Sequence, residues 1–139
     1  MPAAGGKKDL HLFISTGRFR SFEDMRAFID PTYTEDGDAL PSAFMGEVGL
    51  SDFEPGCIEA IHRRHPTKLA TLLEGASYAD QWLPQLDGNR TADAAICVFP
   101  PNRLRHPHRS SLQYLGSYPF EIVHPEWFKR LTRPDGGGR

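Results

Sequence analysis

The chain has 139 residues, of which 39% are hydrophobic and 24% charged, and a formal net charge of −2, as is typical of one soluble globular domain. No window approaches the roughly 18 apolar residues that a membrane span needs, and the N-terminus has no apolar signal core. The composition therefore predicts a cytoplasmic protein that has no membrane partner.

The acidic residues are concentrated in the first half of the chain. Residues 21–61 contain ten acids and one base, Arg26, whereas the rest of the chain contains eight acids and fifteen bases. Surfaces that bind nucleic acid are normally basic, because they contact phosphates. We therefore expect the first half to face a basic partner, or only solvent, and not nucleic acid.

Hydrophobic periodicity and helix-capping signals predict eight elements in the order β-α-α-β-α-α-β-β. They are a strand over 10–15, a helix over 22–30, a short helix from Pro41 to Gly49, a strand over 57–62, a helix from Pro66 to Gly75, a helix that follows Ser77 and ends before Pro84, and strands over 92–99 and 112–120. This order predicts an α+β domain in which a small mixed or antiparallel sheet packs with about four helices.

Two of the helices begin with the signature of a capping box. Ser21 precedes Asp24 by three residues, and Ser77 precedes Asp80 by the same distance. In such a pair the serine accepts a hydrogen bond from the backbone of the helix, and the acid reaches back to the backbone of the serine.

The last two predicted strands differ in their expected positions. Residues 92–99 are apolar nearly throughout, which predicts a central strand, whereas Pro119 indicates either an edge position or a strand end for the strand over 112–120. We expect four side chains of this last strand to be in phase across Gly116, namely Leu112, Tyr114, Tyr118 and Phe120.

The predicted domain boundaries leave two flexible ends. We expect a single domain over residues 10–132, a flexible N-terminus over 1–9 and a disordered tail over 133–139, with a short helix over 125–131. A basic, proline-broken loop covers residues 102–111.

Nothing in the chain indicates a catalytic residue, a cofactor or a metal. The histidine pairs His62/His65 and His106/His108 lie beside arginines and do not supply three or four converging zinc ligands. The acids around Gly37 fail the calcium-loop pattern. Cys57 and Cys97 lie in apolar runs and are expected to be small buried hydrophobic residues. A metal-dependent hydrolase that uses the histidines, or a nucleic-acid module that uses the basic loop 103–109, remains as an alternative.

Five segments carry a pattern that spans most of the chain. They are FISTGRFRSFEDMRAFI, YTEDGDALPSAFMGEVGL, FEPGCIEA, LLEGASYADQWL, and the pair AAICVF and LQYLGSYPF. The most specific positions are Asp36, Asp38, Ser42 and Phe44, followed by Ser77, Tyr78 and Trp82, and then by the segment 115–118 around Gly116. In order and spacing these segments resemble the immunity protein 22 family of bacterial polymorphic toxin systems.

The resemblance implies a non-enzymatic protein that binds and blocks a cognate protein toxin, which is encoded by a neighbouring gene. Nuclease toxins are basic because they bind phosphates, so an acidic surface complements them. The interface charges that we predict are Glu35, Asp36, Asp38, Asp52 and Glu54, and the aromatic anchors are Tyr33 and Phe53. We expect Ser42 and Phe44 to hold the acidic loop in place. The alternatives to an interface role are that Asp36 or Asp38 caps the helix, or that the acids are only solvated.

Overall fold

The structure is a computed structural model that describes residues 7–122. Its strands are β1 (Lys7–Ser15), β2 (Thr32–Tyr33), β3 (Ala39–Leu40), β4 (Ile58–Lys68), β5 (Thr91–Val98) and β6 (Gln113–Glu121). Its helices are α1 (Phe22–Ile29), α2 (Ala43–Val48), α3 (Leu69–Leu72) and α4 (Ala79–Trp82), with short 3-10 helices η1 (Pro55–Cys57), η2 (Leu83–Gln85) and η3 (Pro107–Arg109). The predicted helix over 125–131 and the predicted tail over 133–139 lie outside the described residues.

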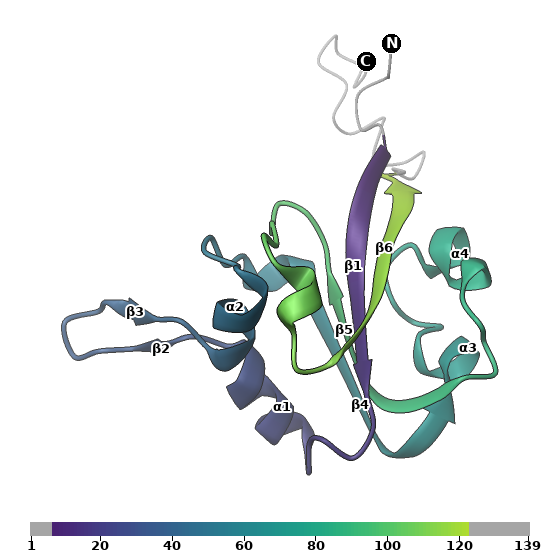
Figure 1. Cartoon of the computed structure of the whole chain (residues 1–139), viewed down its shortest axis with the longest axis horizontal. Helices are drawn as coiled ribbons and strands as arrows, with labels where there is room; N and C mark the ends of the chain where they lie inside the picture. The colour runs from purple at the N-terminus through teal and green to yellow at the C-terminus, as the bar shows by residue number, and fades with distance from the viewer. Residues whose placement is uncertain (1–6, 123–139) are drawn as a thin grey trace, which may run out of the picture.

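Four strands form one antiparallel sheet in the order β4-β5-β1-β6, and β2 and β3 form a separate hairpin (Figure 1). Helices α1 and α2 pack on one face of the sheet, and α3 and α4 pack on the other (Figure 1). The α+β prediction is therefore confirmed, and the sheet is antiparallel.

Strand β5 is the centre of the core. Every residue from Ala92 to Val98 is buried, because β4 and β1 flank the strand and helices cover both of its faces. Cys97 faces the cluster that contains Trp82, whereas Ile96 faces the cluster that contains Phe44. This confirms the central position that the apolar run predicts.

The caps of α1 and α2 explain where these helices begin. Ser21 Oγ accepts the Asp24 N–H at 3.0 Å, but the Asp24 carboxylate accepts the Arg20 N–H, also at 3.0 Å, and not the N–H of Ser21. In α2, Ser42 Oγ accepts the Met45 N–H at 3.1 Å. The helix therefore begins after Ser42, two residues later than the predicted start at Pro41.

The helix predicted from Pro66 is wrong in its first part, because β4 continues through Pro66 to Lys68. A proline lacks the N–H that a sheet ladder needs, but β4 is an edge strand. Its register against β5 also shifts between His62 and Thr67, where a bulge interrupts the ladder. The remaining helix, α3, has only four residues.

The predicted capping box at Ser77 is also wrong. The N-cap residue of α4 is Tyr78, which has a φ of +58° and makes no side-chain cap. Both the N–H and the hydroxyl of Ser77 donate to the carboxylate of Glu59, with 3.0 Å from the nitrogen. Ser77 therefore ties the segment before α4 to β4, which local sequence rules do not indicate.

Strand β6 changes face at Gly116. Leu112 and Tyr114 pack with the α1/α2 cluster, whereas Tyr118 and Phe120 pack with the α3/α4 cluster. The prediction that all four share one face is wrong, because the register between β1 and β6 shifts at this point and Gly116 has a φ of +127°. Of the two readings of Pro119, an edge position or a strand end, the structure has the edge position.

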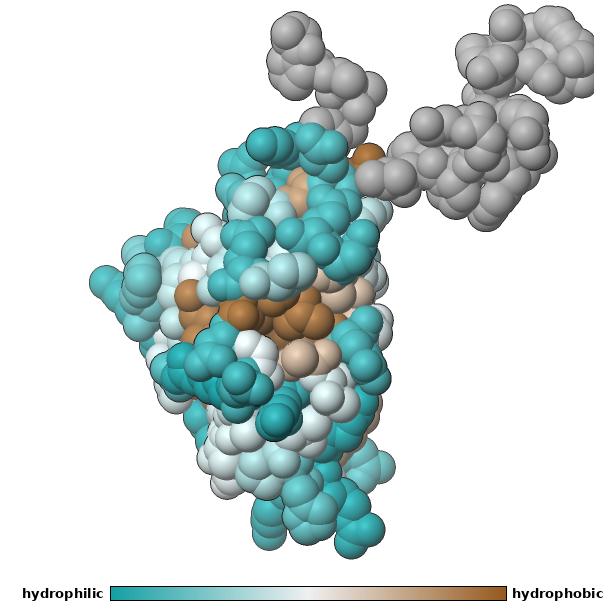
Figure 2. Space-filling view, turned by 90° about the vertical axis from the view of Figure 1, so that its right-hand side faces the viewer, coloured by the Kyte–Doolittle hydropathy of each residue, from teal (hydrophilic) through white to brown (hydrophobic). Residues whose placement is uncertain are grey.

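The face that carries α3 and α4 has a patch of apolar side chains at its centre, surrounded by polar ones (Figure 2). Both helices have four residues, so they cover this face incompletely. Partly buried residues on this side of the core include Leu83, Leu86 and Leu115. No helix within residues 7–122 is long and apolar enough to cross a membrane.

Candidate interaction surface

The predicted acidic loop is the tip of the hairpin formed by β2 and β3, which projects away from the sheet (Figure 1). We call residues 32–40 the acidic hairpin; all of them are exposed. Thr34 closes the turn, because its N–H donates to the Asp38 carbonyl at 2.9 Å and its hydroxyl accepts the Asp38 N–H at 3.1 Å. Gly37 supplies the φ of +89° that the turn requires.

Half of the ten acids in residues 21–61 make a hydrogen bond or an ion pair with another residue of the protein. Asp30 pairs with Arg26 at 2.5 Å, and Glu47 accepts the Ser111 N–H at 2.7 Å. Asp24, Glu54 and Glu59 also accept hydrogen bonds. The other five, whose carboxylates make no hydrogen bond or ion pair within residues 7–122, are called the uncommitted acids: Glu23, Glu35, Asp36, Asp38 and Asp52.

Four of the five predicted interface acids are therefore uncommitted. The exception is Glu54, whose carboxylate accepts the Gly56 N–H at 3.3 Å and remains exposed. Neither Asp36 nor Asp38 caps α2, since Ser42 does so. A carboxylate that makes no hydrogen bond or ion pair within residues 7–122 is available to a basic partner.

The two predicted aromatic anchors, Tyr33 and Phe53, line the same hollow, although twenty residues separate them in the chain. The hollow has a volume of about 490 Å³, and we call it the hairpin hollow. Tyr33 is 66% exposed, whereas Phe53 is half-buried against the α1/α2 core cluster. The other residues that line the hairpin hollow are Arg26, Asp30, Pro31, Ala39, Met45, Ser51 and Pro55.

A second hollow, of about 790 Å³, adjoins the first, and Ser51 and Phe53 line both. Asp52 and Glu54 line it together with Arg103 and Arg105 of the basic loop, so we call it the mixed-charge hollow. Gly49 and Pro101 complete its lining. The basic loop therefore lies beside the acids, and a phosphate at its arginines would also meet two carboxylates, which disfavours nucleic-acid binding here.

Asn102 holds in place the segment over residues 51–57, which lies between the two hollows and which we call the wall. This buried side chain accepts the Glu54 N–H at 2.8 Å and donates to the Glu54 carbonyl at 3.1 Å and to the Phe99 carbonyl at 3.2 Å. Asn102 thus joins residues 51–57 to the end of β5. Asn102 is not among the predicted site residues, because the sequence shows only that a polar residue follows Pro100-Pro101.

The basic loop is docked on the end of α2. The His106 N–H donates to the Val48 carbonyl at 2.8 Å, which satisfies an otherwise unpaired carbonyl at the end of the helix. Gly49 caps the helix with a φ of +72°, and it packs tightly against the loop, since an added Cβ would lie 3.0 Å from the Cβ of Arg105. The loop and the acidic segment are therefore parts of one surface.

The remaining predicted motif residues make contacts within the core of the domain. Phe44 is fully buried, and its ring lies 5.2 Å from that of Phe13. Tyr78 stacks on Phe120 at 5.0 Å, and Trp82 donates from Nε1 to the Ser77 carbonyl at 3.0 Å. These contacts support the fold and lie on the core side of the elements.

The residues considered for catalysis are spread over the described part of the chain. His62 Nε2 lies 3.2 Å from the Phe19 carbonyl oxygen, whereas the His108 ring packs edge-on against Tyr114. In residues 7–122 no group of three or more potential ligands is placed to hold a metal ion. Burial raises the pKa of the Cys97 thiol far above its usual range, which opposes a nucleophilic role.

These features define a small α+β domain with an exposed acidic hairpin, which lines one of two adjoining hollows. The family model described as Immunity protein 22 matches residues 12–121, so the chain belongs to the immunity protein 22 family. Membership of this family indicates a role in neutralising a toxin. The comparisons with curated proteins and with solved structures found no match.

Proposed function

We propose that the protein neutralises a cognate antibacterial toxin, encoded by a neighbouring gene, by tight non-covalent binding in the cytoplasm of the producing cell. The observation that carries the proposal is the acidic hairpin. It combines three uncommitted acids with a Tyr33 that is 66% exposed beside a hollow shared with Phe53. An exposed aromatic side chain next to a hollow is typical of a binding surface.

The charge of this surface favours a basic toxin, such as a nuclease. Glu35, Asp36 and Asp38 form a concentrated negative tip that would steer a basic partner during association. The same acids would occupy the phosphate-binding groove of such a toxin. The protein would act by occlusion, with no catalytic step of its own.

Different parts of the surface have different roles in this proposal. Tyr33 and Phe53 are the anchors, because aromatic residues often carry most of the binding energy of an interface. Asp52 and Glu54 present charge from a wall that Asn102 holds in place. A wall that is already ordered costs less conformational entropy on binding than a flexible loop.

Co-expression with the neighbouring toxin tests the function. We expect the protein to rescue cells and to form a stoichiometric complex on gel filtration. If the protein neither rescues cells nor forms a complex with the toxin, the proposed function is refuted.

A charge-reversal pair tests the location of the interface. The Asp36→Lys/Asp38→Lys variant should reduce the association rate about ten-fold or more at low salt, with a smaller effect at high salt. The matched control is Glu74→Lys/Asp80→Lys, which reverses two exposed acids of the α3/α4 side. If the two variants behave alike, the interface lies elsewhere, although the toxin-neutralising role stands.

A further inference from the structure

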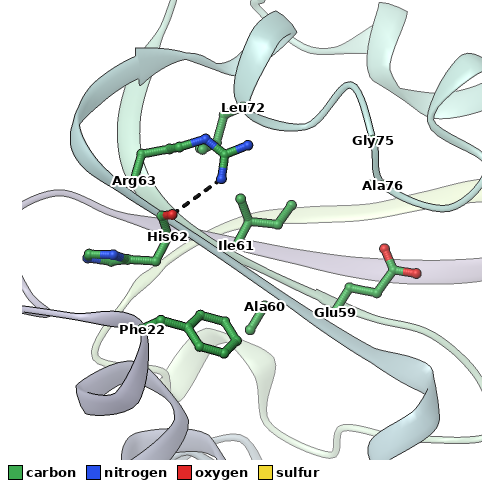
Figure 3. A pocket seen from close by; sticks show the side chains of 9 residues that line it. All are labelled: Phe22, Glu59, Ala60, Ile61, His62, Arg63, Leu72, Gly75 and Ala76. Carbon is green, nitrogen blue, oxygen red and sulfur yellow. Dashed lines mark hydrogen bonds between the residues drawn. The ribbon is translucent and has the colours of Figure 1, made fainter.

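Among residues 7–122, no strand pairs with the outer edge of β4, which lies in a hollow of about 460 Å³ (Figure 3). Residues 59–63 of the strand form the floor of the hollow. Phe22, which is 49% exposed, and Ala60 lie on one side of the strand, and Ile61 and Leu72 lie on the other (Figure 3). A short stretch of strand with apolar walls on both sides is a place where another strand can be added.

The backbone groups that point outward from this edge follow from the register. The Phe99 N–H donates to the Cys57 carbonyl at 2.8 Å, and Ile58 lies opposite Val98. Antiparallel strands alternate between hydrogen-bonded and non-hydrogen-bonded pairs, so the N–H and C=O groups of Ala60 and His62 point away from β5. Consistently, Arg63 Nη1 donates to the His62 carbonyl at 3.3 Å (Figure 3).

The sequence of this edge is complementary to itself in one antiparallel register. If Ile61 lies on a two-fold axis, Ala60 of one copy faces His62 of the other, and the outward backbone groups of both can pair. Glu59 then faces Arg63 of the second copy, and symmetry makes this contact twice. Opposite charges on directly opposed residues stabilise a pair of strands.

The neighbouring registers lack this complementarity. A two-fold axis at Ala60 places Glu59 opposite Ile61, and an axis at His62 places two histidines opposite one another. Only the axis at Ile61 matches both the charges and the outward backbone groups. Because such an axis is perpendicular to the sheet, the exposed Phe22 side chains of the two copies would lie on the same face.

The second half of β4 carries features that prevent pairing. Arg64, Pro66 and the register shift after His62 are devices that protect sheet edges. In the first half, between Ile58 and His62, no proline or bulge interrupts the edge. The length of strand available to a partner is therefore short and ends near Arg64.

We propose that the outer edge of β4 is a self-association surface, at which a second copy of this chain pairs in antiparallel fashion about Ile61. The pairing would join two four-stranded sheets into one of eight strands. This surface is distinct from the acidic hairpin, so the proposal does not depend on the toxin.

Sedimentation equilibrium of the protein alone tests the proposal. The wild-type protein should sediment as a dimer at high concentration. Arg63→Glu places two acids opposite one another at both symmetric contacts and should weaken self-association by about ten-fold or more. The matched control, Arg64→Glu, changes the same charge at a residue opposite Ile58 and should have a smaller effect.

Mixing two variants gives a sharper test. Glu59→Arg should weaken self-association in the same way, but a mixture of Glu59→Arg with Arg63→Glu restores both opposite-charge contacts and should yield a heterodimer. Glu59 also accepts hydrogen bonds from Ser77, so thermal unfolding must first show that the variant is folded. If it is not, Ala60→Pro replaces it, since this removes an outward N–H that β5 does not use, and it should be a folded monomer.

Three results would overturn the proposal: a wild-type monomer at every concentration, equal effects of Arg63→Glu and Arg64→Glu, or a mixture without heterodimer. A wild-type monomer whose Arg63→Glu variant loses toxin binding would assign this edge to the toxin instead. Because the sedimentation experiments contain no toxin, their outcome is independent of the proposed function.

Discussion

The acidic hairpin and the wall at residues 51–57 face the same hollow but are held in different ways. The hairpin is exposed along its whole length and is closed by its own turn. The wall is anchored, since Phe53 packs on the core and Asn102 binds both backbone groups of Glu54. One part of the surface is defined by its charge, and the other by its attachment to the sheet.

This difference separates two contributions to binding. Exposed charges act over distances of several ångströms and mainly influence association rates. Anchored side chains are already close to one conformation and lose less entropy on binding. Variants of the hairpin should therefore change binding without changing stability, whereas variants of the anchor should change stability as well.

The largest effect is expected where α2 joins the core. Phe44 is fully buried against Phe13 and Phe28, so Phe44→Ala should reduce the free energy of unfolding by about 3–5 kcal/mol. Leu40→Ala, in the hairpin, removes a side chain that is 49% exposed and should change it by less than about 0.5 kcal/mol. Urea denaturation measures both, and equal losses would contradict the separation between hairpin and core.

A smaller loss of stability is expected at the anchor. Asn102→Ala leaves the N–H of Glu54 without its partner and should lower the free energy of unfolding by about 1–3 kcal/mol. The control is Asn89→Ala, at an exposed loop position. Hydrogen exchange should show faster exchange at the Glu54 amide in the Asn102 variant, and unchanged exchange there would mean that other contacts order the wall.

The hairpin aromatic should affect binding only. Tyr33→Ala should weaken the complex with the toxin about ten-fold or more, because interface aromatics are frequent hot spots. Its free energy of unfolding should stay within about 0.5 kcal/mol of the wild-type value. Titration calorimetry measures the first effect and urea denaturation the second. Phe22→Ala changes another exposed aromatic, which is 49% exposed and lies outside the hairpin hollow, and it should leave the affinity unchanged.

The smallest effect concerns the support of the basic loop. His11 Nδ1 lies 2.8 Å from the Tyr114 hydroxyl, and Tyr114 in turn contacts His108. Burial lowers the pKa of His11, and the nearby Asp9 only partly opposes this shift. The unfolded chain therefore binds the proton more readily than the folded protein does. The contribution of His11 to the free energy of unfolding should be fully present above a pH of about 6.5, and it should be lost as the pH drops below that value.

The thermal midpoint measured at about pH 7.5 and about pH 5.5 checks this sign. The fall should be smaller in the His11→Gln variant, which has no group that titrates at this position. A fall of the same size in both proteins would assign the pH dependence to other residues.

The positions that the sequence predicted correctly depend on local or strongly periodic signals. The buried run over 92–99 predicted the central strand, and Ser21 and the apolar spacing after it predicted α1. The errors occurred where a distant residue competed with a local rule. Ser77 bonds to Glu59 and does not cap α4, and Pro66 fits into an edge strand beside a bulge.

By itself, the sequence determined the α+β class, the family and the concentration of acids in the first half, because composition, periodicity and ordered motifs are properties of the linear chain. The tertiary structure alone decided which acids are uncommitted and that Tyr33 and Phe53 share a hollow. It also placed the basic loop beside Asp52 and Glu54. Each of these depends on contacts between residues far apart in the chain, such as those of Asn102, and such contacts leave no periodic signal.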